Sequence, residues 1–236
     1  AYLFSLMEIF NSYKQTIPAK HVSIAWLKCA ELLTEFDLLK ENMVYFDNAC
    51  FPGSFILATY HLYQQKFKKP LIQWYGSSLI EINDLNAEPL SDKYGLYKRY
   101  SEHFLMNKTN NGDVLNVANI EDWAKKIKPD LYTSDLGFDV SADYNSQELI
   151  HSTANMGQII SGMCCLKEGG SLITKQYTFF LSFTASLMLV VCDCFKEAYI
   201  TKPTSSKPDN SETYLVGIGF LPEKFAKYKK LMLDKI

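Results

Sequence analysis

The stretch that decides the fold lies late in the chain, where residues 168–176 read EGGSLITKQ. The Gly-Gly pair predicts a turn, and the apolar run after it is typical of a short buried strand that ends at Lys175. Because moving an ammonium group out of water is costly, a lysine at the end of such a strand needs charged partners. The candidates are Lys28, Asp135 and Glu212, which lie near the ends of other predicted elements. Each of them alone would be interpreted as a surface charge, so the hypothesis depends on all four occurring in one pattern.

Strands and helices alternate along the chain. We predict helices over residues 20–40, 54–65, 120–127, 146–166 and 179–191, and strands over residues 43–46, 71–75, 114–117, 131–135, 171–175, 198–201 and 214–220. This alternation predicts right-handed βαβ units and a mostly parallel sheet in an α/β fold. The last two strands are joined by a loop without a helix, which predicts an antiparallel pair at one edge of the sheet. We expect a single domain over residues 1–236 and, because the chain begins with Ala1 rather than Met, a fragment of a longer protein.

Three charged side chains follow or end predicted strands. In sheets of this kind, ligands bind beyond the carboxyl ends of the strands. Asp47, Asp135 and Lys175 all fall at such ends. The sequence therefore predicts a ligand site at that edge of the sheet.

The charge balance is close to neutral, with 24 Lys and Arg against 26 Asp and Glu and a formal net charge of −2. No overall basic field attracts nucleic acid, so any such contact needs a local patch. Four groups of lysines are candidates, within residues 66–69, 125–128, 202–207 and 224–230. A solvated helix or loop face is the more common explanation of each.

The six cysteines occur partly as a Cys-Cys pair (164–165) and a Cys-x-Cys pair (192–194) inside apolar runs. Neither spacing is typical of a metal site or a disulfide framework, and the four histidines are scattered. We therefore expect no metal, and buried free thiols in a reducing compartment. The apolar run over residues 179–191 is too short to span a bilayer, for which about 20 residues are needed, and we expect no membrane association.

The four charged residues resemble the Lys-Asp-Lys-Glu tetrad of FtsJ-like RNA 2′-O-methyltransferases, and their spacing along the chain is also similar to that of the family. Residues 202–212 (KPTSSKPDNSE) resemble the family segment K-P-x-x-S-R-P-x-x-S-E, and residues 134–138 (SDLGF) resemble its fourth-strand motif. The likeness covers residues 20–220. Within the family, the chain most resembles the cap-specific enzymes that methylate the first transcribed nucleotide of mRNA, including those of large DNA viruses.

This resemblance implies a Rossmann-like methyltransferase fold that uses S-adenosylmethionine, with a mostly parallel seven-stranded sheet and an antiparallel edge strand. The cofactor loop of the family usually reads D-x-G-x-x-P-G-G, whereas residues 47–54 read DNACFPGS here. Ala49 and Ser54 stand where glycine usually permits close backbone approach to a ligand, and Phe51 is bulky. The implied cofactor-binding residues are Asp47, Ala49, Pro52, Gly53, Gly76, Asp113 and Asp135, with Asp113 as a partner for the adenine amino group.

The resemblance also implies methyl transfer to a ribose 2′-hydroxyl, with Lys28, Asp135, Lys175 and Glu212 as the catalytic residues. A hydroxyl is a weak nucleophile, so a base must remove its proton or orient its lone pair, and we expect Lys175 to do so. A lysine can act as a base only if its pKa is lowered. We expect burial and the neighbouring Lys28 ammonium to lower it, and Asp135 and Glu212 to oppose this by favouring the charged form. The two acids would hold the lysines in register. The alternative is an ion-pair network that only braces the sheet.

The substrate implied is RNA, specifically the 5′ end of capped mRNA. Lys202, Ser205, Ser206 and Lys207 are the expected phosphate contacts, although a polar hairpin loop would look similar. Aromatic residues between 74 and 104 are candidates for stacking on a base, although a core position is the more common reason for such residues.

Three hypotheses on function remain open at this stage. The first is a cap-type mRNA methyltransferase, favoured by the intact tetrad. The second is an RNA-binding or scaffold protein on a degenerate methyltransferase fold, favoured by the altered cofactor loop. The third is a methyltransferase of ribosomal or transfer RNA. We expect a cytoplasmic location (host cytoplasm or virion if the protein is viral), and we leave open a protein partner or a flanking domain.

Overall fold

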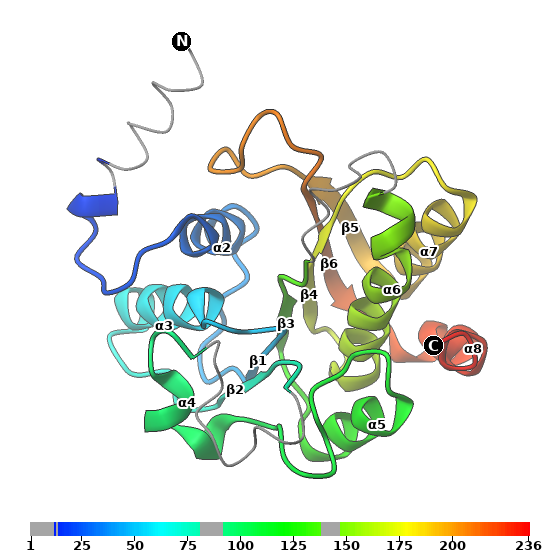
Figure 1. The fold of residues 1–236 in the computed structure, drawn as a ribbon, viewed down its shortest axis with the longest axis horizontal. Coiled ribbons are helices and arrows are strands. Elements are labelled where there is room, and N and C mark those ends of the chain that lie inside the picture. The colour runs from blue at the N-terminus through cyan, green and yellow to red at the C-terminus, as the bar shows by residue number, and fades with distance from the viewer. Residues whose placement is uncertain (1–11, 13, 81–91, 138–146) are drawn as a thin grey trace.

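The computed structural model describes residue 12 and residues 14–80, 92–137 and 147–236. A sheet forms the middle layer. Helices α2 and α3 cover one face, and α5, α6, α7 and α8 lie on the other (Figure 1). Helix α2 (Ile24–Glu35) begins at Ser23, whose side chain accepts a hydrogen bond from the Trp26 amide. Such a cap satisfies one of the amide groups that have no partner within the first turn.

The sheet has six strands over the described residues, in the order β2-β1-β3-β4-β6-β5. They are β1 (Tyr45–Asn48), β2 (Trp74–Ser77), β3 (Leu131–Ser134), β4 (Ser171–Gln176), β5 (Phe195–Thr201) and β6 (Thr213–Phe220). Strands β1 to β4 are parallel, while β6 runs antiparallel to both β4 and β5. The expected antiparallel final pair is therefore confirmed, but the antiparallel strand is second from the edge.

The expected strand over residues 114–117 is wrong, which explains why six strands rather than seven are seen. Val114 lies in a turn, and α5 starts at Val117. The physical reason is Asn116, whose side-chain oxygen accepts a hydrogen bond from the Ala118 amide and caps the helix. A short apolar run was mistaken for a strand because the Asn cap inside it was not recognised.

The remaining helices are α3 (Ser54–Phe67), α4 (Leu96–Arg99), α5 (Val117–Lys126), α6 (Gln147–Cys165), α7 (Ser182–Cys194) and α8 (Pro222–Leu233), with a 3₁₀ turn η2 (Ser101–His103). Each expected helix is present, with ends shifted by a few residues. Residues 81–91 and 138–146 lie outside the described residues. They include part of the aromatic segment between 74 and 104, the last residue of the motif at 134–138 and the first residue of the helix expected over 146–166.

Two apolar clusters form the core, one on each face of the sheet. The first joins α2 and α3 to β1 and β2, and the second joins α5 to α8 to the other face. Most of the aromatic residues between 74 and 104 belong to the first cluster. The Trp74 ring, for example, stacks on His103 with centroids 4.2 Å apart. The cysteines are free thiols as expected, although Cys192 is exposed rather than buried.

Candidate active site

The sheet topology brings three members of the tetrad to one edge. Asp135 directly follows β3, Lys175 is near the end of β4, and Glu212 directly precedes β6. Because β6 is antiparallel to β4, with Tyr214 opposite Lys175, the beginning of β6 meets the carboxyl end of β4. This edge is where ligands bind in parallel α/β sheets.

Lys175 and Asp135 form a largely buried ion pair. The Lys175 Nζ lies 3.1 Å from Asp135 Oδ1 and donates to the Asp135 main-chain oxygen at 3.0 Å. The Tyr214 hydroxyl donates to the same Oδ1 at 2.7 Å. Sequence reasoning missed Tyr214, although its position two residues after Glu212 in an extended strand gave a signal, because alternate residues share a face.

Lys28 and Glu212 form a second pair. Lys28 lies on the side of α2 that faces the sheet, and its Nζ is 2.5 Å from Glu212 Oε1. The buried Ser206 hydroxyl donates to the same oxygen. The four predicted catalytic residues therefore lie in two adjacent ion pairs. The structure brings them together without testing their roles.

The charges of this network set the protonation of its members. Burial alone would lower the pKa of Lys175, but the Asp135 carboxylate and the nearby Glu212 raise it above the ordinary lysine value. Of the opposing effects expected at Lys175, the acids outweigh burial in the chain without substrate, so its pKa is raised rather than lowered, while Lys28 pairs with Glu212. Burial would likewise raise the pKa of Glu212, but Lys28 and Ser206 lower it below its usual range.

A cavity of about 280 Å³ lies beside Asp135 at the same sheet edge. Its walls come from the segments after β1, β2 and β3 and from residues 112–115, and they include Ala49, Phe51, Asp113 and Asp135. The volume is near the lower end of the range for small-molecule sites. Phe51 lines this cavity without filling it, because its ring packs against Phe104 and Tyr97, with centroids 5.7 and 6.4 Å away.

A smaller cavity of about 50 Å³ shares Ala49, Phe51 and Asp135 with the first and is also lined by Asp47. Asp47 is 1% exposed, and its Oδ1 accepts a hydrogen bond from Thr133 at 2.6 Å. Its Oδ2 is buried and has no hydrogen-bond partner among the described residues. Burial raises the pKa of Asp47 well above the usual carboxyl range. An orphaned acceptor of this kind suits a cationic or donor group of a ligand.

The residues present fit S-adenosylmethionine. Asp47 and Asp135 would hold its amino-acid end, and Asp113 would accept from the adenine amino group. Gly112, which lines the larger cavity, has φ +81°, and a Cβ there would come within 2.0 Å of the Ser78 carbonyl oxygen, so this turn requires glycine. Ala49 adopts φ +52°, a left-handed conformation that glycine adopts more readily.

Three other expected cofactor residues do not line the larger cavity. Pro52 lines only the smaller cavity. Gly53 begins α3, and a Cβ on it would meet the Leu96 side chain at 2.3 Å. Gly76 faces the Phe104 ring and the Cys50 sulfur, so the structure places protein atoms there rather than a ligand space.

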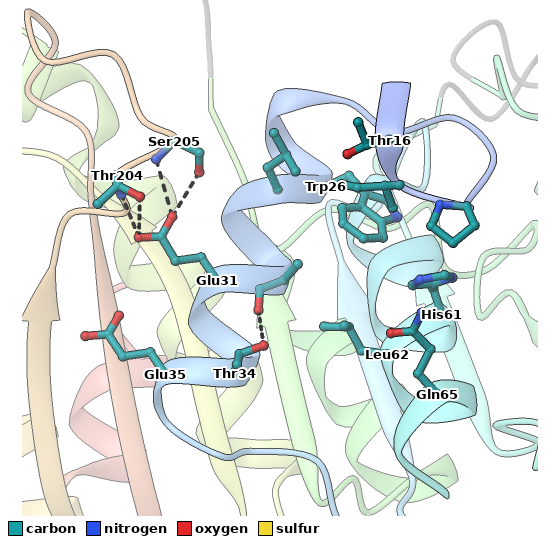
Figure 2. A pocket seen from close by; sticks show the side chains of 14 residues that line it. Thr16, Trp26, Glu31, Thr34, Glu35, His61, Leu62, Gln65, Thr204 and Ser205 are labelled. Carbon is teal, nitrogen blue, oxygen red and sulfur yellow. Dashed lines mark hydrogen bonds between the residues drawn. The ribbon is translucent and has the colours of Figure 1, made fainter. Parts of the chain in front are cut away.

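The predicted RNA-binding loop directs most of its polar groups inward. Lys202 Nζ donates to the Asn210 main-chain oxygen at 2.6 Å and to the Glu212 main-chain oxygen at 3.1 Å. Ser205 donates to Glu31, and Ser206 to Glu212, while Lys207 is exposed. Beside Ser205 is a third cavity, of about 670 Å³, between the loop, α2 and α3 (Figure 2). Lys202 and Lys207 are both exposed, and phosphate contact by this loop remains a prediction.

No group of three or more His, Cys, Asp or Glu side chains suited to a metal ion occurs among the described residues. In the same part of the chain, every helix is too short or too polar to cross a bilayer.

The mixed six-stranded sheet with helices on both faces is the Rossmann-like fold of methyltransferases that use S-adenosylmethionine. The fold is similar to that of *Aeropyrum pernix* fibrillarin in complex with natively bound S-adenosyl-L-methionine, with a TM-score of 0.50 and 10% identity over 82% of this chain and 76% of that one. Residues 21–220 match the FtsJ-like methyltransferase family, and the chain belongs to it.

The chain is also similar to two longer proteins. The chain is 38% identical to "Probable methyltransferase EP424R" of African swine fever virus (isolate Pig/Kenya/KEN-50/1950), over 94% of this chain and 54% of that protein. It is 28% identical to "Cap-specific mRNA (nucleoside-2'-O-)-methyltransferase 2" of *Drosophila melanogaster*, over 90% of this chain and 32% of that protein. The chain thus spans about half the length of its viral relative and a third of the insect one.

Proposed function

We propose that this chain transfers the methyl group of S-adenosylmethionine to a ribose 2′-hydroxyl of RNA, most specifically at the first transcribed nucleotide of capped mRNA. The observation that carries the proposal is the pair of contacts that fix Lys175 Nζ beside Asp135, at the edge where the cavity of about 280 Å³ opens. The cap-specific name of the *Drosophila* relative supports the substrate.

When bound, the cofactor supplies a methyl group on a sulfonium. Asp135 lines the cavity and contacts Lys175, so one residue connects the cofactor space to the acceptor space. Lys175 would hold the 2′-hydroxyl in line with the methyl group and accept its proton as the new carbon–oxygen bond forms. Glu212 and Lys28 would fix the acceptor side of the site by charge.

The raised pKa of Lys175 has a consequence for this role. Only the neutral amine can accept the proton, and at pH 7 the ammonium form dominates because Asp135 stabilises it. The rate of methyl transfer should therefore increase with pH through the alkaline range until Lys175 is deprotonated. Bound RNA would exclude water from the site, and the stronger desolvation of the Lys175 ammonium would lower this pKa.

The proposal includes RNA as the partner and a cytoplasmic location. It also includes Lys207 as a phosphate contact on the predicted RNA-binding loop, residues 202–212, which we call the Ser-rich loop. Free thiols at all six cysteines fit a reducing compartment. A protein partner or a flanking domain is also part of the proposal, because the relatives are longer than this chain.

The test has two stages. Calorimetric titration of S-adenosylmethionine comes first, followed by methyl transfer to a short capped RNA by the wild type and by Lys175→Ala. Uncapped RNA and a capped RNA with a 2′-deoxy first nucleotide are the substrate controls. We expect cofactor binding and Lys175-dependent transfer that disappears with the deoxy substrate.

The scaffold hypothesis has one observation in its favour, the non-glycine Ala49 in a left-handed conformation beside the cavity. Failure of the wild type to bind millimolar cofactor would exclude the stand-alone enzyme and favour that hypothesis. Equal transfer to capped and uncapped RNA would retain the chemistry and reject the cap specificity.

A further inference from the structure

A carboxylate outside the tetrad holds the loop that carries Ser206. Glu31 lies one turn after Lys28 on α2, and its Oε1 accepts from the Thr204 amide at 2.7 Å and from the Thr204 hydroxyl at 3.0 Å. Its Oε2 accepts from the Ser205 amide at 3.3 Å and from the Ser205 hydroxyl at 3.2 Å. Figure 2 shows these four bonds joining α2 to the loop.

These contacts connect directly to the second ion pair of the site. Ser206, the residue after Ser205, donates its hydroxyl to Glu212 Oε1, which also contacts Lys28 Nζ. Residues three apart on a helix lie on the same side, so Lys28 and Glu31 approach the loop region together. The result is a closed ring: from Lys28 through Glu212 and Ser206 to the loop, and back through Glu31 to the same helix.

The ring of contacts holds Glu212 in position although this residue lies outside the helices and strands. Strand β5 ends at Thr201 and β6 begins at Thr213, so residues 202–212, which include Glu212, contain no helix or strand. Such a segment is restrained only by the bonds that it makes, and hydrogen bonds to a charged group are stronger than neutral ones. Four donors on one carboxylate therefore provide the anchor at the far end of the segment from β6.

We infer that Glu31 is a positioning residue for the methyl-transfer site, which fixes the Ser-rich loop so that Ser206 and Glu212 hold Lys28 in place. This inference rests on the proposed function for its effect on rate, and on geometry alone for the link between Glu31 and Glu212. Glu31 need not touch either substrate.

The experiment uses the full chain with Glu31→Gln and Glu31→Asp, and with Glu35→Gln as the matched control. A glutamine keeps the shape but has a single acceptor oxygen, and its amide group cannot accept from the Ser205 donors. Aspartate keeps both oxygens on a shorter stem. Glu35 is one turn further along α2, exposed and on the same side (Figure 2).

Two readouts are independent of each other. Steady-state methyl transfer gives kcat and KM, and we expect Glu31→Gln to lower kcat by about tenfold, since a displacement of about 1 Å far from the chemistry can cost up to about 100-fold. Glu31→Asp should recover part of this loss. Glu35→Gln should match the wild type, and the affinity for S-adenosylmethionine should be unchanged in all three.

The second readout is the pKa of the Glu212 carboxyl group, measured from the pH dependence of its carboxyl-carbon chemical shift by NMR. Its pKa is lowered partly by the Ser206 hydrogen bond, so a loosened loop in Glu31→Gln should raise it toward the ordinary glutamate value. A Glu212 pKa in Glu31→Gln equal to that of the wild type would overturn the inference. A change in kcat of twofold or less, accompanied only by a lower Tm, would also overturn it. If the wild type transfers no methyl group, the proposed function fails, and the NMR result still decides the role of Glu31.

Discussion

Replacing Asp135 with asparagine tests the Lys175–Asp135 pair most directly. The two side chains are 20% and 12% exposed for Asp135 and Lys175, with 3.1 Å between their charged atoms. Removing one partner of a buried pair typically costs about 3–5 kcal/mol, because the other charge remains buried without compensation. Here the remaining acceptors lessen the loss, since Lys175 keeps the Asp135 main-chain oxygen and an asparagine can still accept from Tyr214.

We therefore expect Asp135→Asn to lower the free energy of unfolding by about 3 kcal/mol at pH 7, the lower end of that range. For a domain of this size, that is a decrease in Tm of about 6–12 °C. Urea unfolding measures the change directly. Asp193→Asn is the matched control, because it removes the acid of an exposed pair with Lys224 and should leave the midpoint near that of the wild type.

The pH dependence gives this prediction its sign. In the wild type the pKa of Lys175 is raised in the folded chain, so its contribution is fully present below the ordinary lysine pKa and is lost as pH rises through the folded value. In Asp135→Asn the burial effect is no longer offset by this carboxylate and lowers that pKa, so the stability deficit should shrink as pH rises toward the ordinary lysine pKa of about 10.5 and the lysine loses its charge.

A double-mutant cycle with Lys175→Met supplies the refutation. In the Lys175→Met background no ammonium remains, so Asp135→Asn should cost much less, with a coupling energy of about 2 kcal/mol. A deficit below about 0.5 kcal/mol at pH 7 would show that the pair is not a compensated buried charge, and so would a coupling energy near zero.

Three further predictions follow from single positions. Gly112→Ala should lower stability by at least about 2 kcal/mol and weaken cofactor binding in calorimetry, because its Cβ would meet Ser78; unchanged values would mean that the turn adapts. Ala49→Gly should raise the free energy of unfolding in urea by about 0.5–1 kcal/mol, since glycine adopts φ +52° without strain; a decrease would show that chain entropy outweighs the strain. Lys28→Met should raise the pKa of Glu212. In the wild type, the lowered pKa of Glu212 contributes stability that is present above its unfolded pKa and is lost as pH falls through the folded value. Acid unfolding of the variant should therefore begin at a higher pH, and an unchanged acid transition would contradict the pairing.

Several features of the site could be predicted because they depend on local pattern. The alternation of apolar runs with turn residues indicated β1, β3 and β4, and a charged residue at the end of each marked the ligand edge. Parallel strands place their carboxyl ends together whatever their order, so Asp135 and Lys175 were expected to be near each other. A cavity lined by Asp113 and Ala49 lies at this edge of the sheet, and cofactor binding there stays a prediction.

Other features depended on contacts between distant segments. The sequence named the effects that act on the Lys175 pKa but not their balance, which the structure decides in favour of the acids, with Asp135 beside Lys175 and Lys28 paired with Glu212. The pattern gave the four charges but not their pairing, since several pairings satisfy the same spacing. The inward direction of Ser205 could not be expected either, because its acceptor Glu31 lies on a helix 174 residues earlier.

The sequence by itself determined the α/β class, the family and the residues that carry charge at the sheet edge, because these follow from periodicity, turn chemistry and motif spacing. Only the tertiary structure decided which charge meets which. An ion pair requires two atoms to come within about 4 Å, and that distance is set by how α2 packs on the sheet and where β6 inserts beside β4. The same packing determines the protonation of Lys175, Glu212 and Asp47, because burial and the nearest opposite charge act over the same few ångströms.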